Sequence, residues 1–315
     1  MQKRRLGQTD IEVTSIGLGG NKFGGGQGMI SRMMSPDLPR EQINAVIQAA
    51  LDGGINWFDT AELYGFGASE QNITTALHAA EKKDDEIIIA TKWSPFLRTA
   101  KNITRTIEKR LHFLQSYSID LYMIHMPMSF SSIEDQMDAM AKLVGAGKIR
   151  AVGVSNFDAE QMRLAHTALE KRGLPLAVNQ VQYNLLDRDI EVNGVLETAK
   201  ELGITIIAWG PLGSGILTGK FHKNPELLDR SPYMRRMIRK RKVERSKPII
   251  SLLEEVAARY KVSPAQVALN WLMNVHGEAV VAIPGASRPE HAEQSAGAMQ
   301  FSLSEDDMAR LSEAH

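Results

Sequence analysis

Four side chains in the first half of the sequence have types that together could deliver a proton to an oxygen atom: Asp59, Tyr64, Lys92 and His125. A phenol is a weak acid with a reference pKa of about 10. A nearby ammonium group favours the phenolate, so Lys92 would make the proton of Tyr64 easier to release. Asp59 would hold and orient Lys92, and His125 would hydrogen-bond the substrate oxygen or relay a proton. Carbonyl reduction requires such a donor beside an oxygen that gains charge.

Each of these residues also has a purely structural interpretation. Asp59 and Lys92 could form an ion pair that only braces two strands. His125 could be a core histidine bonded to a backbone carbonyl, and Tyr64 could be an ordinary loop residue. Groups with perturbed pKa values occur in structural networks as well as in active sites. The functional interpretation therefore depends on whether the fold brings all four residues to one place.

Short apolar runs rich in β-branched residues alternate with amphipathic stretches along the chain. Such runs predict parallel strands that are covered on both faces. They lie at residues 15–19, 55–58, 86–91, 120–125, 149–155, 176–181, 203–209 and 279–284. Helical patterns lie between them, for example at 40–54 and at 263–277, where Ser263 is a predicted N-cap and Pro264 stands in the first turn.

Eight strand–helix units favour a closed (β/α)8 TIM barrel, with an open doubly wound sheet as the alternative. A small hairpin before residue 16 and a long loop between strands seven and eight complete the predicted order. We see no linker or repeat, so residues 1–315 are predicted to form a single domain. Catalytic residues of such barrels stand where the strands end. The barrel therefore places Asp59, Lys92 and His125 at one mouth, and the following loop can fold Tyr64 over them.

A second group of residues at strand ends could hold a cofactor. Ser155 and Asn156 supply a hydroxyl and an amide suited to a carboxamide group. Gln180 could join them or could be an ordinary glutamine of the barrel interior. Trp209 could stack on a flat heteroaromatic ring or could simply pack in the core.

Two later segments are candidates for phosphate binding. The segment GPLGSGILTGK at 210–220 offers backbone N–H groups and Lys220, although it lacks the spacing of a P-loop. Pro289 marks a helix start, and helix N-termini bind phosphate, often in the loops after strands seven and eight of a barrel. Arg288 would then contact an extra ribose phosphate, or else it is a solvated surface arginine.

The stretch GLGGNKFGGGQG at 17–28 has the composition of a nucleotide loop but not the spacing of one. Neither the dinucleotide fingerprint nor the P-loop pattern can be aligned to it. Its place after the first strand predicts instead a pliable flap over the substrate at residues 23–28, since glycine permits movement and close approach. The alternative is a loop without any ligand contact.

The overall composition excludes several classes of site and partner. The 315 residues carry no net charge and no cysteine, which excludes disulfides, thiolate metal sites and cysteine nucleophiles. The basic run at 235–245 could bind the phosphates of a nucleic acid. Because the whole chain has no net charge, the run is better interpreted as a solvated helix or lid near the cofactor. No apolar run is long enough to cross a bilayer, and the basic start is not followed by a signal-like segment. We expect a cytoplasmic protein that binds neither nucleic acid nor membrane.

Taken together, these motifs resemble those of the aldo-keto reductases over essentially the whole chain. The segment FDTAELYG at 58–65, with Lys92 and His125, is similar to the Asp-Tyr-Lys-His tetrad of that superfamily. GVSNF at 153–157, NQVQYN at 179–184, WGPLGSGILTGK at 209–220 and IPGAS at 283–287 are similar to its cofactor-binding segments. The variants around Trp209 and at 283–287 resemble the branch that contains bacterial reductases and potassium-channel β subunits.

The resemblance implies a role for each matched residue. Tyr64 would be the general acid, tuned by Asp59 and Lys92, and His125 would orient the carbonyl. Ser155, Asn156 and Gln180 would hold the nicotinamide carboxamide, with Trp209 against the ring. The remaining implied cofactor residues are Gly20, Asn21, Gly210, Pro211, Leu212, Gly213, Lys220, Gly285, Ser287, Arg288, His291 and Gln294. Two positions depart from the pattern: Gly210 replaces a common serine, and Gln294 with Ser295 replaces a common Glu-Asn pair at the adenosine site.

These residues predict an NADPH-dependent reductase of aldehydes or ketones. NADPH is preferred to NADH because Ser287 and Arg288 suit a 2′-phosphate. Trp93 and Met126 are predicted to line the substrate pocket. The alternatives are a redox-sensing NADPH-binding module like the channel β subunits, whose counterpart of His125 is Asn, and a lyase that uses Lys92 as a Schiff base. The sequence does not indicate the oligomeric state.

Overall fold

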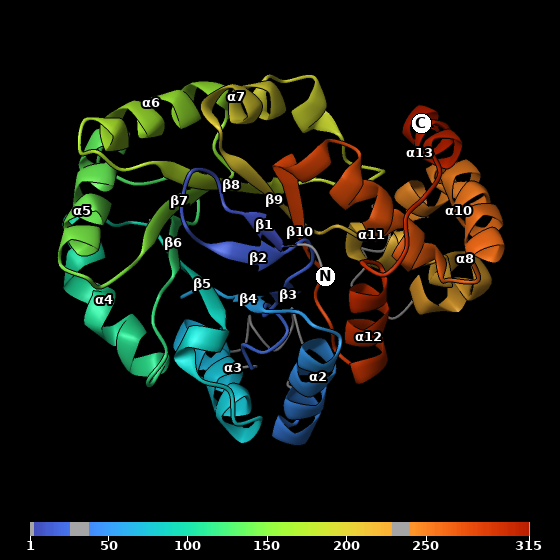
Figure 1. The fold of residues 1–315 in the computed structure, drawn as a ribbon, viewed down its shortest axis with the longest axis horizontal. Coiled ribbons are helices and arrows are strands. Elements are labelled where there is room, and N and C mark those ends of the chain that lie inside the picture. Colours follow the sequence, from blue (N-terminus) through green and yellow to red (C-terminus); the bar gives the residue numbers. More distant parts are fainter. Residues whose placement is uncertain (1–2, 26–37, 229–239, 315) are drawn as a thin grey trace.

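The computed structural model describes residues 3–25, 38–228 and 240–314. Within these ranges, eight parallel strands form one sheet in the order β10-β9-β8-β7-β6-β5-β4-β3. Their bounds are β3 (Leu18–Gly19), β4 (Trp57–Asp59), β5 (Ile88–Trp93), β6 (Leu121–Ile124), β7 (Ala151–Ser155), β8 (Leu176–Gln182), β9 (Thr205–Trp209) and β10 (Val280–Ile283). Parallel bridges from Ile16 to Ala282 and from Gly19 to Gly285 join the first segment to the last. The sheet is thus a nearly closed barrel, and the predicted TIM-barrel fold is confirmed (Figure 1).

Helices surround this barrel on the outside (Figure 1). Those that follow the first six strands are α2 (Arg40–Asp52), α3 (Ala68–Ala79), α4 (Lys101–Phe113), α5 (Ile133–Gly145), α6 (Ala159–Glu170) and α7 (Val195–Leu202). The long connection from β9 to β10 contains α8 (Lys220–Lys223), α10 (Lys247–Tyr260) and α11 (Pro264–Asn274), and the chain continues with α12 (Pro289–Gly297) and α13 (Glu305–Glu313).

Local sequence signals explain where these helices begin. Ser263 Oγ accepts a hydrogen bond from the backbone N–H of Gln266, and the side-chain oxygen of Gln266 accepts one from the backbone N–H of Ser263, which forms a capping box before Pro264. In α2 the buried residues recur at helical spacing and face the core. The predicted N-cap of α11 and the predicted helix at 40–54 are both confirmed.

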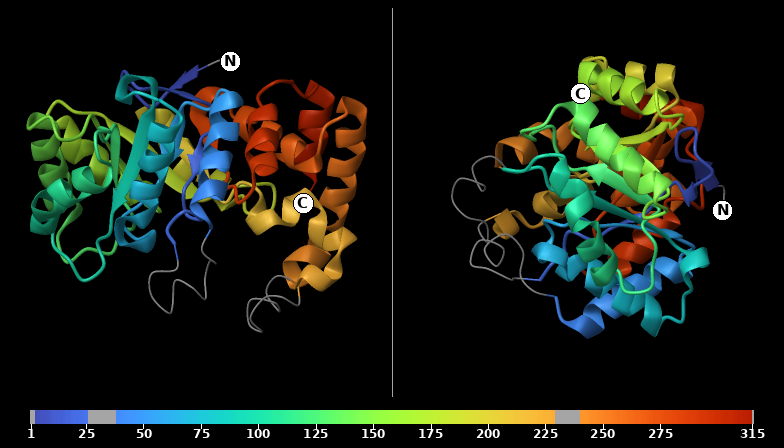
Figure 2. Two further views of the ribbon diagram at one scale, coloured as in Figure 1. Left: turned by 90° about the horizontal axis from the view of Figure 1, so that it is seen from below. Right: turned by 90° about the vertical axis from the view of Figure 1, so that its left-hand side faces the viewer.

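A short hairpin closes one end of the barrel, as predicted from the segment before residue 16. It consists of β1 (Lys3–Arg5) and β2 (Glu12–Thr14), which pair antiparallel. Its apolar residues Leu6, Ile11 and Val13 are buried in one cluster with the inward side chains of the strands. The hairpin lies at the amino ends of the strands (Figure 2). There the Thr14 N–H donates a hydrogen bond to Asn56 Oδ1, and the Gly7 N–H donates one to Thr205 Oγ1. The opposite end, where the strands finish, is therefore the mouth.

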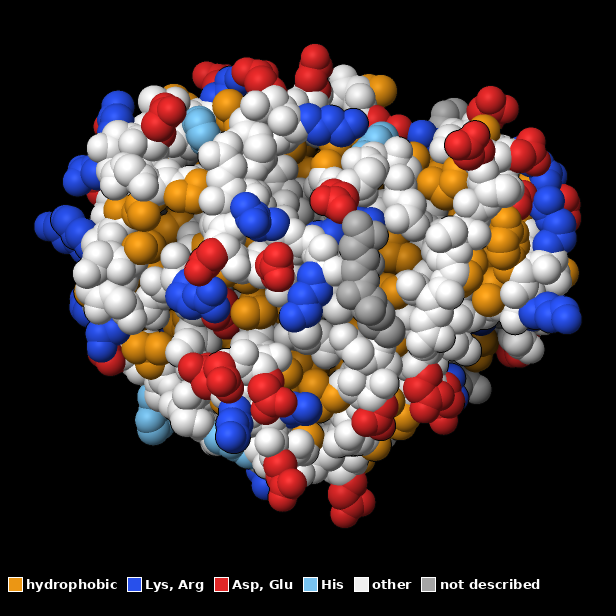
Figure 3. Space-filling view, viewed as in Figure 1, with side chains coloured by type: hydrophobic (Ala, Val, Ile, Leu, Met, Phe, Trp, Pro, Cys, Tyr) orange, Lys and Arg blue, Asp and Glu red, His pale blue; other side chains and the backbone are white. Residues whose placement is uncertain are grey.

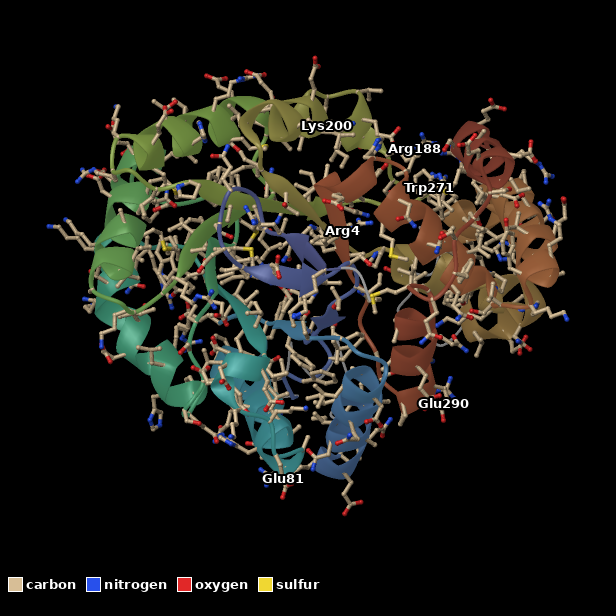
Figure 4. All side chains as sticks on the ribbon, in the orientation of Figure 1. Arg4, Glu81, Arg188, Lys200, Trp271 and Glu290 are labelled. Atoms are coloured by element: carbon tan, nitrogen blue, oxygen red, sulfur yellow. The ribbon has the colours of Figure 1, made fainter. Side chains whose placement is uncertain are left out.

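Arg4 fastens this hairpin to the helical layer. Its guanidinium donates to the carbonyls of Met273, at the end of α11, and Val280, at the start of β10. It also donates to Asn274 Oδ1 at 3.0 Å. The side chain comes from the hairpin at the centre of the view in Figure 4. Arg4 is only 7% exposed, and its hydrogen bonds to the Met273 and Val280 carbonyls are buried. Removal of the guanidinium would therefore leave these two carbonyls without this donor.

Arg4→Met is therefore expected to lower the free energy of unfolding by about 1.5–3 kcal/mol, the range for hydrogen bonds made by charged groups. Urea unfolding followed by circular dichroism measures this change. Arg5→Met is the matched control, because Arg5 is the exposed neighbour on the same strand. An equal loss in both variants would contradict an anchoring role for Arg4.

On the face that carries the hairpin, acidic and basic side chains are interspersed and no large area has a single sign of charge (Figure 3). Among the described residues, no helix is both long enough and apolar enough to cross a membrane.

Candidate active site

The four predicted catalytic residues come from three adjacent strands and meet at the mouth. Asp59 is the last residue of β4, Lys92 is in β5, and His125 follows β6 directly. β4 pairs with β5, and β5 pairs with β6. Tyr64 lies in the loop after β4, with its ring 5.2 Å from Lys92 Nζ and 5.9 Å from the His125 ring. The fold thus brings together the four residues that the sequence separates by up to 66 positions.

Lys92 is locked in place by hydrogen bonds. Its Nζ lies 2.9 Å and 2.7 Å from the two carboxylate oxygens of Asp59, and it donates to the Thr60 carbonyl at 2.9 Å. Both side chains of the ion pair are buried. Burial is the largest influence and lowers the pKa of Lys92, but the charges and hydrogen bonds of Asp59 and Tyr64 together outweigh it, so the pKa lies above its ordinary value. Lys92 is therefore an ammonium beside Tyr64.

The pKa of Tyr64 is raised rather than lowered in this structure. Burial raises it, the charge of Lys92 opposes that effect, and the charge of Asp59 adds to it. The predicted influence of Lys92 thus has the expected sign, but burial outweighs it. Tyr64 is accordingly a protonated phenol at neutral pH, which is the form that a general acid needs.

His125 is a neutral imidazole in this structure. Burial lowers its pKa to about 3, and the nearby charge of Lys92 acts in the same direction. Its Nδ1 atom is buried without a hydrogen-bond partner among the described residues. A buried N–H without an acceptor is costly, so the proton belongs on Nε2. His125 is then a neutral hydrogen-bond donor at the mouth.

Because neither group titrates near neutral pH, kcat/KM for the reaction is expected to stay flat from about pH 8 down to about pH 5. The acid form of Tyr64 is lost only as pH rises through its raised pKa. The neutral form of His125 is lost only as pH falls towards its lowered pKa. Initial rates across a pH series test this, and a limb near pH 6.5 that disappears in His125→Gln would contradict the neutral imidazole.

The glycines after β3 support the loop that carries Tyr64. Gly20 donates its N–H to the Asp59 carbonyl at 2.7 Å, and its own carbonyl accepts from Ser69 Oγ. A Cβ added to Gly24 would lie 2.7 Å from the Tyr64 carbonyl carbon, and one added to Gly65 would lie 1.7 Å from the Gly24 carbonyl oxygen. Glycine is therefore required where the two segments touch. Of the predicted flap, residues 23–25 lie here, and 26–28 fall outside the described residues.

The predicted carboxamide-binding group forms one connected cluster. Trp209 Nε1 donates to Asn156 Oδ1 at 3.0 Å, and Asn156 Nδ2 donates to Ser155 Oγ and to the His125 carbonyl. Ser155 in turn donates to the Gln180 carbonyl at 2.8 Å. Trp209 is 36% exposed, which leaves part of its ring open to a partner.

The side chain of Gln180 contacts the predicted catalytic residues. Its Nε2 donates to Asp59 Oδ1 at 2.7 Å, and the residue is buried. The sequence predicts for Gln180 either a cofactor contact or an ordinary place in the barrel interior, and it does not predict the contact with Asp59. Its position in the barrel interior explains why it reaches Asp59 across the barrel.

The two predicted phosphate-binding segments also approach each other. Gly210, Gly213, Ser214, Gly215 and Gly219 all have positive φ, so the chain after β9 turns repeatedly. The Lys220 ammonium folds back against this turn, 2.8 Å from where a Cβ on Gly215 would be. Such a run of turns presents backbone groups to a ligand, as anion-binding loops do.

The segment after β10 supplies two more nitrogen-bearing side chains. Arg288 is the N-cap residue of α12, and its guanidinium lies 3.3 Å from His291 Nε2. Burial lowers the pKa of His291, and the charges of Arg288 and Lys220 lower it further. The positive charges of Lys220, after β9, and of Arg288, after β10, therefore both influence His291. Two positive charges near one place suit the negative charge of a phosphorylated cofactor.

The other predicted cofactor residues are placed as follows. Ser287 is half-buried and its carbonyl accepts from Gln42, while Gln294 is exposed on α12. Asn21 Oδ1 lies 3.2 Å from where a Cβ on Gly285 would be, so these two predicted contacts are neighbours. Pro211 is buried and Leu212 is half-buried at the turn after β9. Cofactor contact by these residues stays a prediction.

The predicted substrate contact of Trp93 is wrong in this structure. Trp93 is 0% exposed, it belongs to the main hydrophobic core, and its indole donates to Asn102 at 3.0 Å. Side chains alternate along a strand, so a Lys92 that points into the barrel sends Trp93 outward towards the helices. Met126 is half-buried just beyond β6. Of the basic run at 235–245, residues 235–239 lie outside the described residues.

Two features of the site have no counterpart in the sequence predictions. Glu70 and Arg110 form a fully buried ion pair of 2.7 Å, and Glu70 also accepts from Thr91, next to Lys92. Burial raises the pKa of Glu70 to about 7 against the charge of Arg110. Large apolar side chains are also exposed on the loops around Tyr64. Their signal in the sequence is the pair of phenylalanines, Phe66 and Phe96, in loops that are usually polar.

Comparison with known proteins places this geometry in a family. Residues 15–315 match the family described as the Aldo/keto reductase family. Aldo-keto reductase YhdN of Bacillus subtilis is 33% identical over 98% of this chain and 91% of its own length. The solved structure of the thermostable aldo-keto reductase Tm1743 in complex with the inhibitor epalrestat has a TM-score of 0.77 at 30% identity, with full coverage of both chains.

An aldo-keto reductase from Klebsiella pneumoniae, solved in complex with NADPH, has a TM-score of 0.72 at 28% identity. The match covers 99% of this chain and 94% of that one. The family match covers nearly the whole chain, and the solved relatives have similar folds. Both findings agree with the four residues that meet at the mouth. The chain belongs to the aldo/keto reductase family and is an NAD(P)H-dependent oxidoreductase.

Proposed function

We propose that this protein reduces small aldehydes or ketones with NADPH, and that Tyr64 is the general acid. The observation that carries the proposal is the contact of a protonated phenol, a locked ammonium and a neutral imidazole at one mouth. Such a set stabilises a carbonyl oxygen as it gains negative charge. The bound nicotinamide cofactor would supply the hydride to the carbonyl carbon.

The residues of the chain then account for the proton. His125 donates a hydrogen bond from Nε2 to the carbonyl oxygen and orients it. Tyr64 transfers its phenolic proton to that oxygen, which completes the alcohol. The positive charge of Lys92 stabilises the phenolate that Tyr64 becomes, and Asp59 keeps Lys92 charged and in place. Proton transfer from a positioned acid accelerates such a step by about 10²–10⁴-fold.

Ser155, Asn156 and Trp209 would hold the nicotinamide, and Lys220 with Arg288 would hold the phosphates. The proposal of NADPH over NADH rests on Arg288 at the start of α12, where a 2′-phosphate would meet a guanidinium. The lyase alternative is disfavoured, because the three N–H donors of Lys92 are already engaged with Asp59 and the Thr60 carbonyl.

The direct test is NADPH oxidation by the purified protein with a panel of aldehydes and ketones. We expect turnover with NADPH, and a ratio of NADPH to NADH affinity that falls in Arg288→Gln. Tight NADPH binding with very slow turnover on every carbonyl compound would favour the binding-module alternative instead. Borohydride trapping of a substrate on Lys92 would support the lyase.

A further inference from the structure

The first turn of α3 contacts both the loop that carries Tyr64 and the strand that carries Lys92. Two consecutive residues of this turn, Ser69 and Glu70, are polar and yet 0% exposed. We call them the α3 pair. Ser69 bonds the Tyr64 loop, and Glu70 bonds β5 beside Lys92. Buried polar side chains cost free energy unless they are hydrogen-bonded, so the partners of the α3 pair indicate its role.

Ser69 fixes the end of the loop that carries Tyr64. Its N–H donates to the Tyr64 carbonyl at 3.1 Å, and its hydroxyl accepts from Thr60 Oγ1 at 2.8 Å. The start of the loop is held by backbone bonds to β5, the last of which runs from the Glu62 N–H to the Lys92 carbonyl at 3.1 Å. Past Glu62, the described residues of the loop make no further backbone bond to β5. The backbone of Tyr64 therefore depends on Ser69 for its position.

Glu70 fixes β5 one residue before Lys92. Its Oε1 accepts from Thr91 Oγ1, and its Oε2 accepts from Arg110 of α4, both at 2.7 Å. All three side chains are buried. Successive side chains of a strand point to opposite faces, so Thr91 points outward when Lys92 points into the barrel. If the strand turned about its axis, both side chains would move together. A bond that holds Thr91 therefore also sets the direction of Lys92.

Stability alone does not explain the buried charges of Glu70 and Arg110. The loss of hydration of two buried ions commonly offsets their attraction, and apolar side chains of similar volume often stabilise a protein as well or better. Apolar side chains cannot, however, accept a directed hydrogen bond from the Thr91 hydroxyl. Arg110 orients the acceptor by binding its second oxygen. The pair is thus better explained by the direction that it gives to Thr91.

We propose that the α3 pair positions the tetrad: Glu70 sets the direction of Lys92 through Thr91, and Ser69 sets the place of Tyr64. Both act through other residues and are therefore positioning residues. This inference rests on the proposed function, because it concerns the contact between Lys92 Nζ and the Tyr64 ring, 5.2 Å from the ring centroid. Since Ser69 and Glu70 are adjacent in one helical turn, they hold the proton donor and the ammonium in one fixed relation.

The test compares Thr91→Val with Thr91→Ser in the full-length protein. Valine keeps the shape of threonine and removes the hydroxyl, whereas serine keeps the hydroxyl. We expect kcat for aldehyde reduction with NADPH to fall by about 10–100-fold in Thr91→Val, because a misplacement of about 1 Å can cost about 10²-fold. Thr91→Ser should restore kcat to within about threefold of the wild type, and in both variants KM for the aldehyde should change by less than about twofold.

Glu70→Gln separates position from stability. Glutamine has the same length and still bonds the Thr91 hydroxyl, but it leaves the buried charge of Arg110 without an anion. We expect a lower midpoint of urea unfolding, with kcat much closer to the wild type than in Thr91→Val. Arg4→Met is the matched control, because it is expected to destabilise the protein from the opposite end of the barrel. If Arg4→Met lowered kcat as much as Thr91→Val, the loss would follow from destabilisation and the inference would be overturned.

A second readout needs no turnover. In protein labelled with ¹³C at tyrosine Cζ, the NMR signal of Tyr64 is the one that is absent from Tyr64→Phe. The ammonium of Lys92 lies beside this ring, so a displaced Lys92 should shift the signal at neutral pH. We expect a shift in Thr91→Val and the wild-type position in Thr91→Ser and Arg4→Met.

The outcomes separate this inference from the proposed function. Aldehyde reduction that is lost in Tyr64→Phe but kept in Thr91→Val, with an unmoved signal, would overturn the positioning role and leave the function standing. Absence of aldehyde reduction in the wild type, with a signal that moves in Thr91→Val and not in Thr91→Ser, would overturn the function and support the positioning role. Equal losses of kcat in Thr91→Val and Thr91→Ser would assign the effect to packing at position 91 and overturn the inference.

Discussion

Replacing Tyr64 with phenylalanine is expected to lower kcat for aldehyde reduction by about 10²–10⁴-fold, the usual contribution of a positioned general acid. The substitution removes one oxygen atom and keeps the ring that packs beside Lys92 and His125. No other described side chain at the mouth is a protonated acid in contact with both of them. Steady-state rates with NADPH and one aldehyde measure the loss.

Two controls separate lost chemistry from lost structure. NADPH affinity should be unchanged in Tyr64→Phe, because Tyr64 is not among the predicted cofactor contacts, which lie in or just after β3, β7, β8, β9 and β10 and on α8 and α12. Tyr117→Phe is the matched variant, because Tyr117 also has a raised pKa but precedes β6, at the end of the barrel opposite the mouth, where its hydroxyl donates to the Lys82 carbonyl. A Tyr64→Phe enzyme with wild-type kcat would remove Tyr64 as the acid and return it to an ordinary loop residue.

The sequence predicts the barrel and the tetrad well because both leave local signals. Continuous apolar runs mark each strand, and one polar residue terminates three of them, at Asp59, Lys92 and His125. The barrel geometry then makes strand ends neighbours without any knowledge of side-chain packing. The hairpin is equally predictable, since the turn residues Gly7 to Asp10 separate KRRL from the alternating segment IEVT.

The sequence does not predict features that depend on the direction of a side chain or on the balance between burial and nearby charge. Trp93 is predicted to line the substrate pocket, yet the alternation of side chains along the strand buries it in the core. Gln180 reaches across the barrel to Asp59, a contact between residues 121 positions apart. The pKa of Tyr64 depends on burial as well as on Lys92, and burial cannot be read from the two residue types.

Lys92→Met is expected to have the second large effect, on stability as well as on activity. The substitution keeps the length of the side chain and leaves the buried carboxylate of Asp59 without its cation. Breaking a buried ion pair from one side typically costs about 3–5 kcal/mol. The loss should be smaller at low pH, because an unpaired buried Asp59 has a raised pKa and becomes neutral as pH falls through it. Urea unfolding at pH 5 and pH 8 measures both effects.

The double variant Asp59→Asn/Lys92→Met distinguishes a catalytic ammonium from a mere brace. Asparagine removes the unpaired charge and can still accept the hydrogen bond that Gln180 donates at position 59. Stability should therefore recover by at least half of the loss seen in Lys92→Met, and it should no longer depend on pH in the same way. Aldehyde reduction should stay as low as in the single variant, because no positive charge remains to stabilise the Tyr64 phenolate. Recovery of activity together with stability would mean that the pair only braces β4 against β5.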